Sequence, residues 1–272
     1  MTRRSDRPFA EAERLRRAYG CYAVVTGASD GIGRAIARRL AEAGFGLVLV
    51  ARRKAVLDAL ADELEQRGRI RPLVIAADLS VADDVARIDR ETQQLDVGLL
   101  VEAAGFGTSG PFIAGDLADE LNMIDVNCRA LAQLTHLFGR RFAARRRGGI
   151  VLMSSLVAFQ GVPRAANYAA TKAFVQSLAE GLGPELKPLG VDVLASAPGP
   201  VMSGFGQRAG MSIASGQTPD EVAVGTLKML GRRTTVRPGF LAKALEAGLM
   251  LLPRAARAAM MARVMAGMTQ TT

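Results

Sequence analysis

The chain has 272 residues, 49% of them hydrophobic, and a formal net charge of +9. This apolar content is enough for a buried core and excludes a chain that is disordered throughout. One His and two Cys argue against a zinc site and a disulfide framework, so Cys21 and Cys128 are expected to be reduced thiols.

The basic residues are scattered and have no aromatic residues interleaved with them, so we predict no nucleic-acid site. A phosphate-bearing cofactor or an acyl thioester would account for part of the charge. No stretch reaches the roughly 18–20 apolar residues that span a bilayer, and no apolar segment follows Arg3 and Arg4 as in a secretion signal. These features predict a cytoplasmic protein.

In chain order, an N-terminal arm with a charged amphipathic helix (residues 1–20) precedes a core of alternating apolar and helical segments (21–238). The predicted strands are residues 22–26, 47–51, 73–77, 97–101, 150–154 and 191–196, and the predicted helices are 33–43, 54–66, 82–94, 117–144 and 165–187. Near-continuous apolar strands are typical of parallel sheets covered on both faces. The pattern predicts an α/β fold, a single-domain Rossmann-type doubly wound parallel sheet with a C-terminal helical extension (239–272).

A glycine-rich turn follows the first strand and leads directly into a helix. Its spacing, G-x-x-x-G-x-G, suits a tight turn and the close approach of a pyrophosphate to the backbone. The helix N-terminus offers free N–H groups and a positive dipole end to phosphates. We therefore predict a dinucleotide site formed by Gly27, Ser29, Asp30, Gly31, Ile32 and Gly33.

The end of the second strand indicates which dinucleotide binds. NAD-binding chains usually place an acid there for the ribose 2′-hydroxyl, whereas this chain has Arg52 and Arg53. A guanidinium pairs well with a 2′-phosphate, so we predict NADP(H), with Arg52 as the first choice and Arg53 as the second. The competing interpretation is that both are solvated charges at the start of a helix.

Three polar residues indicate the chemistry. Tyr168 and Lys172 are four residues apart on a predicted helix and share one face. An ammonium near a phenol favours the phenolate and lowers the pKa of Tyr168, which would allow it to act as a general acid or base. Ser155 follows a predicted strand and precedes Tyr168 by 13 residues, enough for a loop to return to the helix.

Together these residues resemble the short-chain dehydrogenase/reductase family over nearly the whole chain, most closely its 17β-hydroxysteroid dehydrogenase and 3-oxoacyl-CoA reductase branch. The resemblance implies that Tyr168 exchanges a proton with the substrate oxygen, Ser155 hydrogen-bonds that oxygen, and Lys172 holds the nicotinamide ribose. It also implies a water link through Asn127 and a homodimer or homotetramer. Further cofactor contacts implied by the resemblance are Asp78, Leu79, Ala104, Gly105, Pro198, Gly199, Val201 and Ser203. The family's Asn-Asn pair before Ala104 is Glu102-Ala103 here, which makes a glutamate near the cofactor unexpected.

The expected substrate pocket is apolar. Loops beyond the strand ends should supply its walls, with Phe106, Phe112, Phe159, Met202 and Phe205 as the main candidates and Val162 and Met211 as further ones. The extension carries an apolar stripe that includes Met260, Met261, Val264, Met265 and Met268, opposed by arginines. Three interpretations remain open for residues 240–268: packing against the pocket or a second subunit, peripheral contact with a membrane surface, and a partly disordered tail.

The sequence thus predicts an NADP(H)-dependent oxidoreductase that interconverts a carbonyl and a secondary alcohol on an apolar, steroid-like or 3-oxoacyl substrate. The alternative is a redox-sensing regulator that binds NADP(H) without turnover. Such a regulator would have no need of the proton-transfer pair, which this chain keeps.

Overall fold

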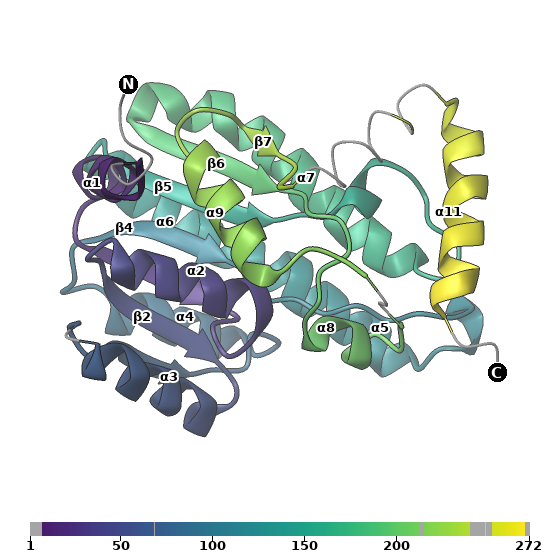
Figure 1. The fold of residues 1–272 in the computed structure, drawn as a ribbon, viewed down its shortest axis with the longest axis horizontal. Coiled ribbons are helices and arrows are strands. Elements are labelled where there is room, and N and C mark those ends of the chain that lie inside the picture. Colours follow the sequence, from purple (N-terminus) through teal and green to yellow (C-terminus); the bar gives the residue numbers. More distant parts are fainter. Residues whose placement is uncertain (1–6, 68, 213–214, 240–247, 249–251, 270–272) are drawn as a thin grey trace.

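The computed structural model describes residues 7–67, 69–212, 215–239, 248 and 252–269. Its centre is a parallel sheet of strand order β3-β2-β1-β4-β5-β6-β7 (Figure 1). The strands are β1 (Tyr22–Thr26), β2 (Gly46–Ala51), β3 (Leu73–Ala76), β4 (Val97–Glu102), β5 (Gly148–Met153), β6 (Val191–Ser196) and β7 (Thr235–Val236). This confirms the doubly wound sheet. The two-residue strand β7 was not predicted, because so short a segment carries no periodicity.

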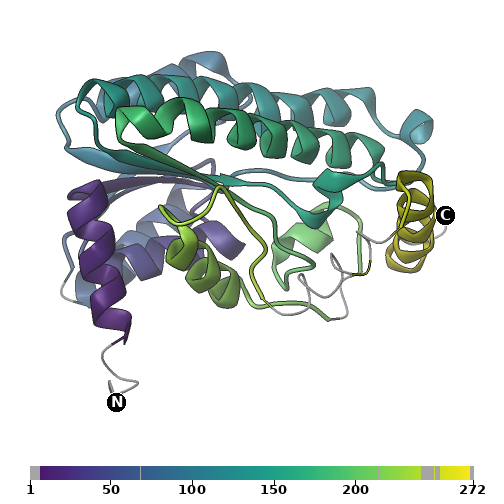
Figure 2. The same ribbon diagram turned by 90° about the horizontal axis from the view of Figure 1, so that it is seen from above.

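Helices cover both faces of the sheet, as Figure 2 shows from above. They are α1 (Arg7–Tyr19), α2 (Gly31–Glu42), α3 (Lys54–Gln66), α4 (Ala82–Glu91), α5 (Leu117–Ile124), α6 (Leu131–Ala144), α7 (Ala166–Leu186), α8 (Gly204–Arg208), α9 (Pro219–Met229) and α11 (Arg254–Met268). Residues of α1, α2, α3 and α9 form one buried apolar cluster against the sheet. Residues of α4, α6 and α7 form a second cluster on the opposite face. Strands buried on both sides explain the uninterrupted apolar runs in the sequence.

The predicted helix over residues 117–144 is not a uniform α-helix. Its two α-helical parts, α5 and α6, are joined by a π-helical turn, Asp125–Ala130, that contains Asn127. Such turns insert a residue into the α-helical ladder and are frequent at functional sites. Apolar periodicity cannot reveal one, because the apolar face continues on both sides of it. Helix α2 also begins two residues earlier than predicted, within the glycine-rich turn.

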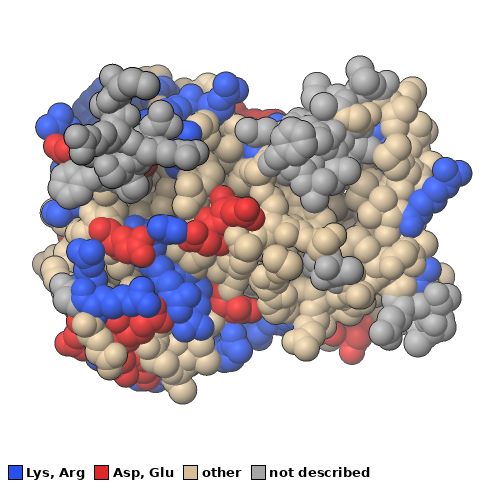
Figure 3. Space-filling model, viewed as in Figure 1, with Lys and Arg blue, Asp and Glu red and all other residues tan. Residues whose placement is uncertain are grey.

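The net positive charge is not gathered in one patch on the face shown in Figure 3. Basic and acidic side chains alternate there around α2 and α3, while the surface toward α11 carries few charges. Several of these charges are paired, such as Arg38 with Glu63 at 2.7 Å and Arg39 with Asp220 at 2.5 Å. Within the described part of the chain, no helix is long and apolar enough to cross a membrane.

Candidate active site

A cavity of about 860 Å³ opens at the carboxyl edge of the sheet. The chain order reverses there between β1 and β4, and in open parallel sheets such a switch point is where ligands bind. All of the residues predicted to bind the cofactor line this cavity, from Gly27 in the first turn to Ser203 before α8. The cavity also contains Ser155, Tyr168 and Lys172.

The glycine-rich turn leaves room for a ligand because it excludes side chains. Gly27 has a φ of +66°, and a Cβ there would lie 2.8 Å from the carbonyl oxygen of Ala103. A Cβ on Gly33 would overlap the Gly27 carbonyl, so only glycine allows α2 to start this close to β1. The Asp30 side chain makes no capping hydrogen bond to α2. The N-terminus of the helix is therefore left to face a phosphate, and these residues fit a dinucleotide.

The two arginines after β2 line the same cavity. Arg53 donates a hydrogen bond to the Ser29 hydroxyl at 3.3 Å, which holds it beside the glycine-rich turn. Arg52 forms no ion pair with any described residue. Both guanidiniums are thus placed where a dinucleotide would put its adenosine ribose.

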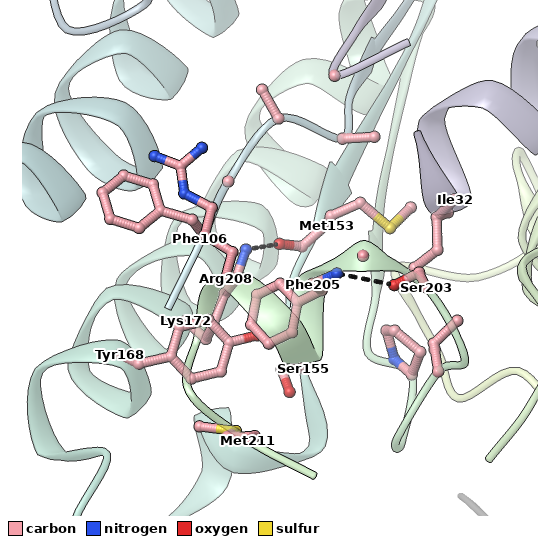
Figure 4. Close-up of a pocket in the computed structure, with 18 of the residues that line it drawn as sticks. Ile32, Phe106, Met153, Ser155, Tyr168, Lys172, Ser203, Phe205, Arg208 and Met211 are labelled. Atoms are coloured by element: carbon pink, nitrogen blue, oxygen red, sulfur yellow. Dashed lines mark hydrogen bonds between the residues drawn. The ribbon is translucent and has the colours of Figure 1, made fainter. Parts of the chain in front are cut away.

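The catalytic candidates converge on one wall of the cavity (Figure 4). Ser155 follows β5, and Tyr168 and Lys172 lie one turn apart on α7. The Ser155 side chain lies near the Tyr168 phenol and lowers its pKa, and the Lys172 ammonium donates to the carbonyl oxygen of Met153 at 2.8 Å. The Tyr168 ring packs against Phe205, with ring centroids 5.3 Å apart. The chain thus aims a serine hydroxyl and a phenol at one point of an apolar cavity.

The expected effect of Lys172 on Tyr168 is not present in this structure. Burial raises the pKa of Tyr168 to about 12, and the hydrogen bond with Ser155 opposes this only in part. Burial also lowers the pKa of Lys172 to about 8. The expectation was wrong because desolvation outweighs the ammonium charge: Lys172 Nζ lies 5.9 Å from the centre of the Tyr168 ring.

Asn127 does not line the cavity. Its side chain is 1% exposed and binds protein groups: Oδ1 accepts from the Phe106 N–H at 3.1 Å, and Nδ2 donates to the Phe106 carbonyl at 2.9 Å and to the Thr171 hydroxyl at 3.1 Å. It therefore joins the loop after β4 to α7. We assign it as a positioning residue, since it acts through Phe106 and the helix that carries Tyr168.

Glu102 points away from the cofactor side. It is 3% exposed at the end of β4 and accepts a hydrogen bond from the Thr135 hydroxyl of α6 at 2.7 Å. Burial holds the pKa of this carboxyl well above its usual range, and the hydrogen bond from Thr135 acts against this shift. The Thr26 hydroxyl accepts from the Ala104 N–H at 3.2 Å and supports the loop after β4.

A buried glutamate that the sequence did not single out also supports this region. Glu120 is 7% exposed on α5, and its carboxylate accepts from the Thr108 hydroxyl at 2.7 Å and from the Asn167 amide at 2.6 Å. Asn167 immediately precedes Tyr168, and Thr108 lies in the loop that follows β4. The only signal in the sequence was a pair of acids, Asp119 and Glu120, in the first turn of a helix, which occurs too often to be informative.

The apolar end of the cavity differs from the prediction. Phe106, Phe205 and Met211 line it, as expected, but Phe112, Phe159 and Met202 do not. Phe112 is 54% exposed and Met202 is 48% exposed, and the Phe159 ring instead lies under the Arg237 guanidinium. Residue type alone cannot show which way a loop turns, so these three assignments were wrong. Val162 is buried in the cluster that contains Tyr168 but does not line the cavity.

Helix α11, in the described part of the C-terminal extension, stands at one end of the molecule (Figures 1 and 2) and lines this end of the cavity. Helix α11 contributes Met260, Met261, Val264, Met265 and Met268 to the lining. Met265 is 4% exposed in the cluster that also contains Tyr168, and the Ser212 N–H donates to the Met268 carbonyl at 2.8 Å. Of the three interpretations, the structure shows packing against the pocket. Positions 240–247 and 249–251 of the extension lie outside the described residues, and membrane contact stays a prediction.

Comparison with known proteins agrees with this geometry. Residues 22–211 match the family model of the short chain dehydrogenases. The chain is 38% identical over 179 residues to the very-long-chain 3-oxoacyl-CoA reductase of Neurospora crassa, covering 64% of this chain and 54% of that protein. It is 31% identical over 229 residues to the 7beta-hydroxysteroid dehydrogenase of Clostridium sardiniense, covering 83% and 88% of the two chains. A solved short-chain dehydrogenase from Sphingobium yanoikuyae in complex with NADPH has a TM-score of 0.76 at 32% identity, covering 86% of this chain and 96% of that one.

The chain spans about half the length of the 3-oxoacyl-CoA reductases that it matches. The two named relatives nevertheless confirm the resemblance to the hydroxysteroid and 3-oxoacyl-CoA branch. The match to the family model covers more than half of the chain and includes the glycine-rich turn and the three catalytic candidates. The chain belongs to the short-chain dehydrogenase/reductase family.

Proposed function

We propose that this protein is an NADP(H)-dependent reductase that interconverts a ketone and a secondary alcohol on a bulky apolar substrate. The observation that carries the proposal is the meeting of Ser155, Tyr168 and Lys172 on one wall of a cavity whose other end is built for a dinucleotide. Bound NADPH would supply the hydride. The chain's own groups then have to hold the substrate oxygen and provide a proton.

The proton comes from Tyr168 in this scheme. Its high pKa keeps the phenol protonated at neutral pH, so in the direction of reduction it can donate to the substrate oxygen as negative charge develops there. The Ser155 hydroxyl donates a second hydrogen bond to the same oxygen. Lys172, once its ammonium faces the bound cofactor, stabilises the phenolate that remains. Because the apolar walls exclude water, the hydrogen bond from Ser155 and the stabilisation of the phenolate by Lys172 are both stronger.

The substrate class follows from the walls of the cavity. Methionines of α11 together with Phe205 and Met211 form a broad apolar surface that can adapt to different shapes, because methionine side chains are flexible. A steroid or a 3-oxoacyl chain would bury its apolar body there. The names of the two relatives support these same two classes.

Arg52 is proposed to select the phosphorylated cofactor. We expect Arg52→Ala to raise the Kd for NADPH about 10- to 100-fold, since a charge-assisted hydrogen bond contributes about 1.5–3 kcal/mol, and to leave the Kd for NADH unchanged. Fluorescence titration with both cofactors measures this. The matched control is Lys54→Ala, which removes a neighbouring charge that is paired with Asp58 at 2.8 Å. Equal affinities of the wild type for the two cofactors would refute the assignment.

The pH dependence of kcat/KM is expected to reflect the protonation state of Lys172. We expect kcat/KM for reduction to be level below about pH 8 and to fall above it, because burial lowers the pKa of Lys172 to about 8 and the ammonium is then lost. Tyr168, with a pKa of about 12, keeps its proton over this range. The fall should be absent from the residual activity of Lys172→Arg, since a guanidinium stays charged. A profile that rises through pH 8 would contradict this assignment.

Turnover itself separates the proposal from a redox-sensing regulator. A panel of bulky ketones, 3-oxoacyl thioesters and oxidised steroids should contain at least one substrate that consumes NADPH. Tight NADPH binding without turnover of any member would favour the regulator.

We also propose a homo-oligomer. The exposed apolar side chains on α5 and α7 support it: Leu117 is 67% exposed, Leu121 53% and Phe174 42%. Such a patch on adjoining helices is typical of a surface that a second copy covers.

A further inference from the structure

Arg208 lines the same cavity as Arg52. It is the last residue of α8, which starts directly after Ser203 at the cofactor end of the cavity. Its side chain crosses to the loop after β4, where the guanidinium carbon lies 4.2 Å above the centre of the Phe106 ring (Figure 4). Phe106 is 5% exposed and is itself held by Asn127, so this ring is a firm support for the guanidinium.

The charges around Arg208 are those of the cofactor site. Partial burial lowers the pKa of Arg208, the positive charge of Arg52 lowers it further, and Asp119 and Asp78 act against this. Two guanidiniums that repel each other in a ligand cavity favour an anion between them. Within the described parts of the chain, no carboxylate lies within ion-pair distance of either Arg52 or Arg208. Other arginines of the described chain, such as Arg38 and Arg39, are paired.

We propose that Arg208 binds a phosphate group of the dinucleotide and so closes α8 over the bound cofactor. The inference rests on the proposed use of a nicotinamide dinucleotide. The phosphate is either the 2′-phosphate, shared with Arg52, or the pyrophosphate at the glycine-rich turn. Both are anions for which a guanidinium is the best-suited side chain. Since α8 also carries Phe205, the same contact keeps that ring against Tyr168 at the substrate end.

The experiment compares the affinity of wild type and Arg208→Gln for five compounds: NADPH, NADH, 2′-phospho-ADP-ribose, ADP-ribose and adenosine. If Arg208 contacts the 2′-phosphate, Arg208→Gln binds NADPH and 2′-phospho-ADP-ribose about tenfold more weakly than the wild type and binds the other three compounds equally well. If Arg208 contacts the pyrophosphate, the variant binds all four phosphate-bearing compounds more weakly, by about the same factor, and its affinity for adenosine is unchanged. Both results support the proposal. Arg208→Lys keeps the charge without the planar donor fork and should show a smaller loss, of about threefold.

The matched control is Arg140→Gln, which removes an exposed arginine of α6 that lies outside the cavity. It should bind all five compounds as the wild type does. Unchanged dissociation constants in Arg208→Gln would overturn the inference, as would an equal loss for adenosine, which would indicate stacking on the base. A raised KM for an anionic substrate with unchanged cofactor binding would also overturn it. If the wild type binds neither dinucleotide, the proposed function fails first, so the two failures are distinguishable.

Discussion

Tyr168→Phe is expected to lower kcat/KM for carbonyl reduction about a thousandfold, or about 4 kcal/mol in transition-state stabilisation. The substitution removes only the hydroxyl that donates the proton, and it keeps the ring that packs against Phe205 at 5.3 Å. Steady-state kinetics with the best substrate of the panel measures the loss. Titration with NADPH should show a Kd within a few fold of the wild type, because the walls around the dinucleotide are unchanged.

The control for this substitution is Tyr22→Phe. Tyr22 lies at the start of β1, at the opposite end of the strand from the cavity, so activity should stay within about twofold of the wild type. If Tyr168→Phe kept more than about a tenth of the activity, another group would have to supply the proton, because a general acid contributes at least about a hundredfold. The alternative source closest to the substrate oxygen would be the Ser155 hydroxyl.

Gly98→Ala is expected to destabilise the fold by about 3 kcal/mol or more, and to lower Tm by roughly 6–12 °C. Gly98 lies in the central strand β4 at a break in the register with β1, where Tyr22 pairs with Val97 and Ala23 pairs with Leu99. An added Cβ would overlap the main-chain carbonyl of Tyr19 at the end of α1. Main chain cannot move aside as a side chain can, so α1 has to separate from the sheet. Thermal denaturation measures the effect.

Gly139→Ala is the matched control for this prediction. Gly139 is also buried, but its Cβ would meet only the Ile150 side chain, at 3.9 Å, and it lies inside α6. Alanine there should leave the stability unchanged or raise it by about 0.5–1 kcal/mol, because it favours the helix. Equal melting temperatures for Gly98→Ala and the wild type would show that α1 is not tightly packed against β4.

The cofactor end and the catalytic pair are encoded locally. The glycine-rich turn joins one strand to the next helix, and Tyr168 and Lys172 are one helical turn apart, so their relative positions follow from the secondary structure. Apolar runs buried on both faces identify the strands, and parallel strands with right-handed crossovers bring their carboxyl ends to one edge. Residues at the ends of several strands therefore meet without any detailed knowledge of packing.

The substrate end depends on contacts between distant segments, which no local pattern encodes. Helix α11 lines the cavity because Met265 packs into the cluster around Tyr168, about a hundred residues away in the sequence. Phe106 lines the cavity and Phe112 is exposed to solvent, although both are phenylalanines. The difference arises from the direction in which the loop turns at each residue, which residue type does not reveal.

Burial also decides properties that the sequence cannot express. The Tyr168 and Lys172 pKa values are shifted by desolvation, which depends on all the atoms packed around them rather than on their spacing. Likewise, Arg208 and Arg52 line one cavity, although they lie more than 150 residues apart in the sequence. The sequence by itself therefore determined the fold and was enough to predict the candidate cofactor and proton-transfer residues. Only the tertiary structure decided the shape of the substrate end and the electrostatics of the groups within it, because both arise from packing between segments far apart in the chain.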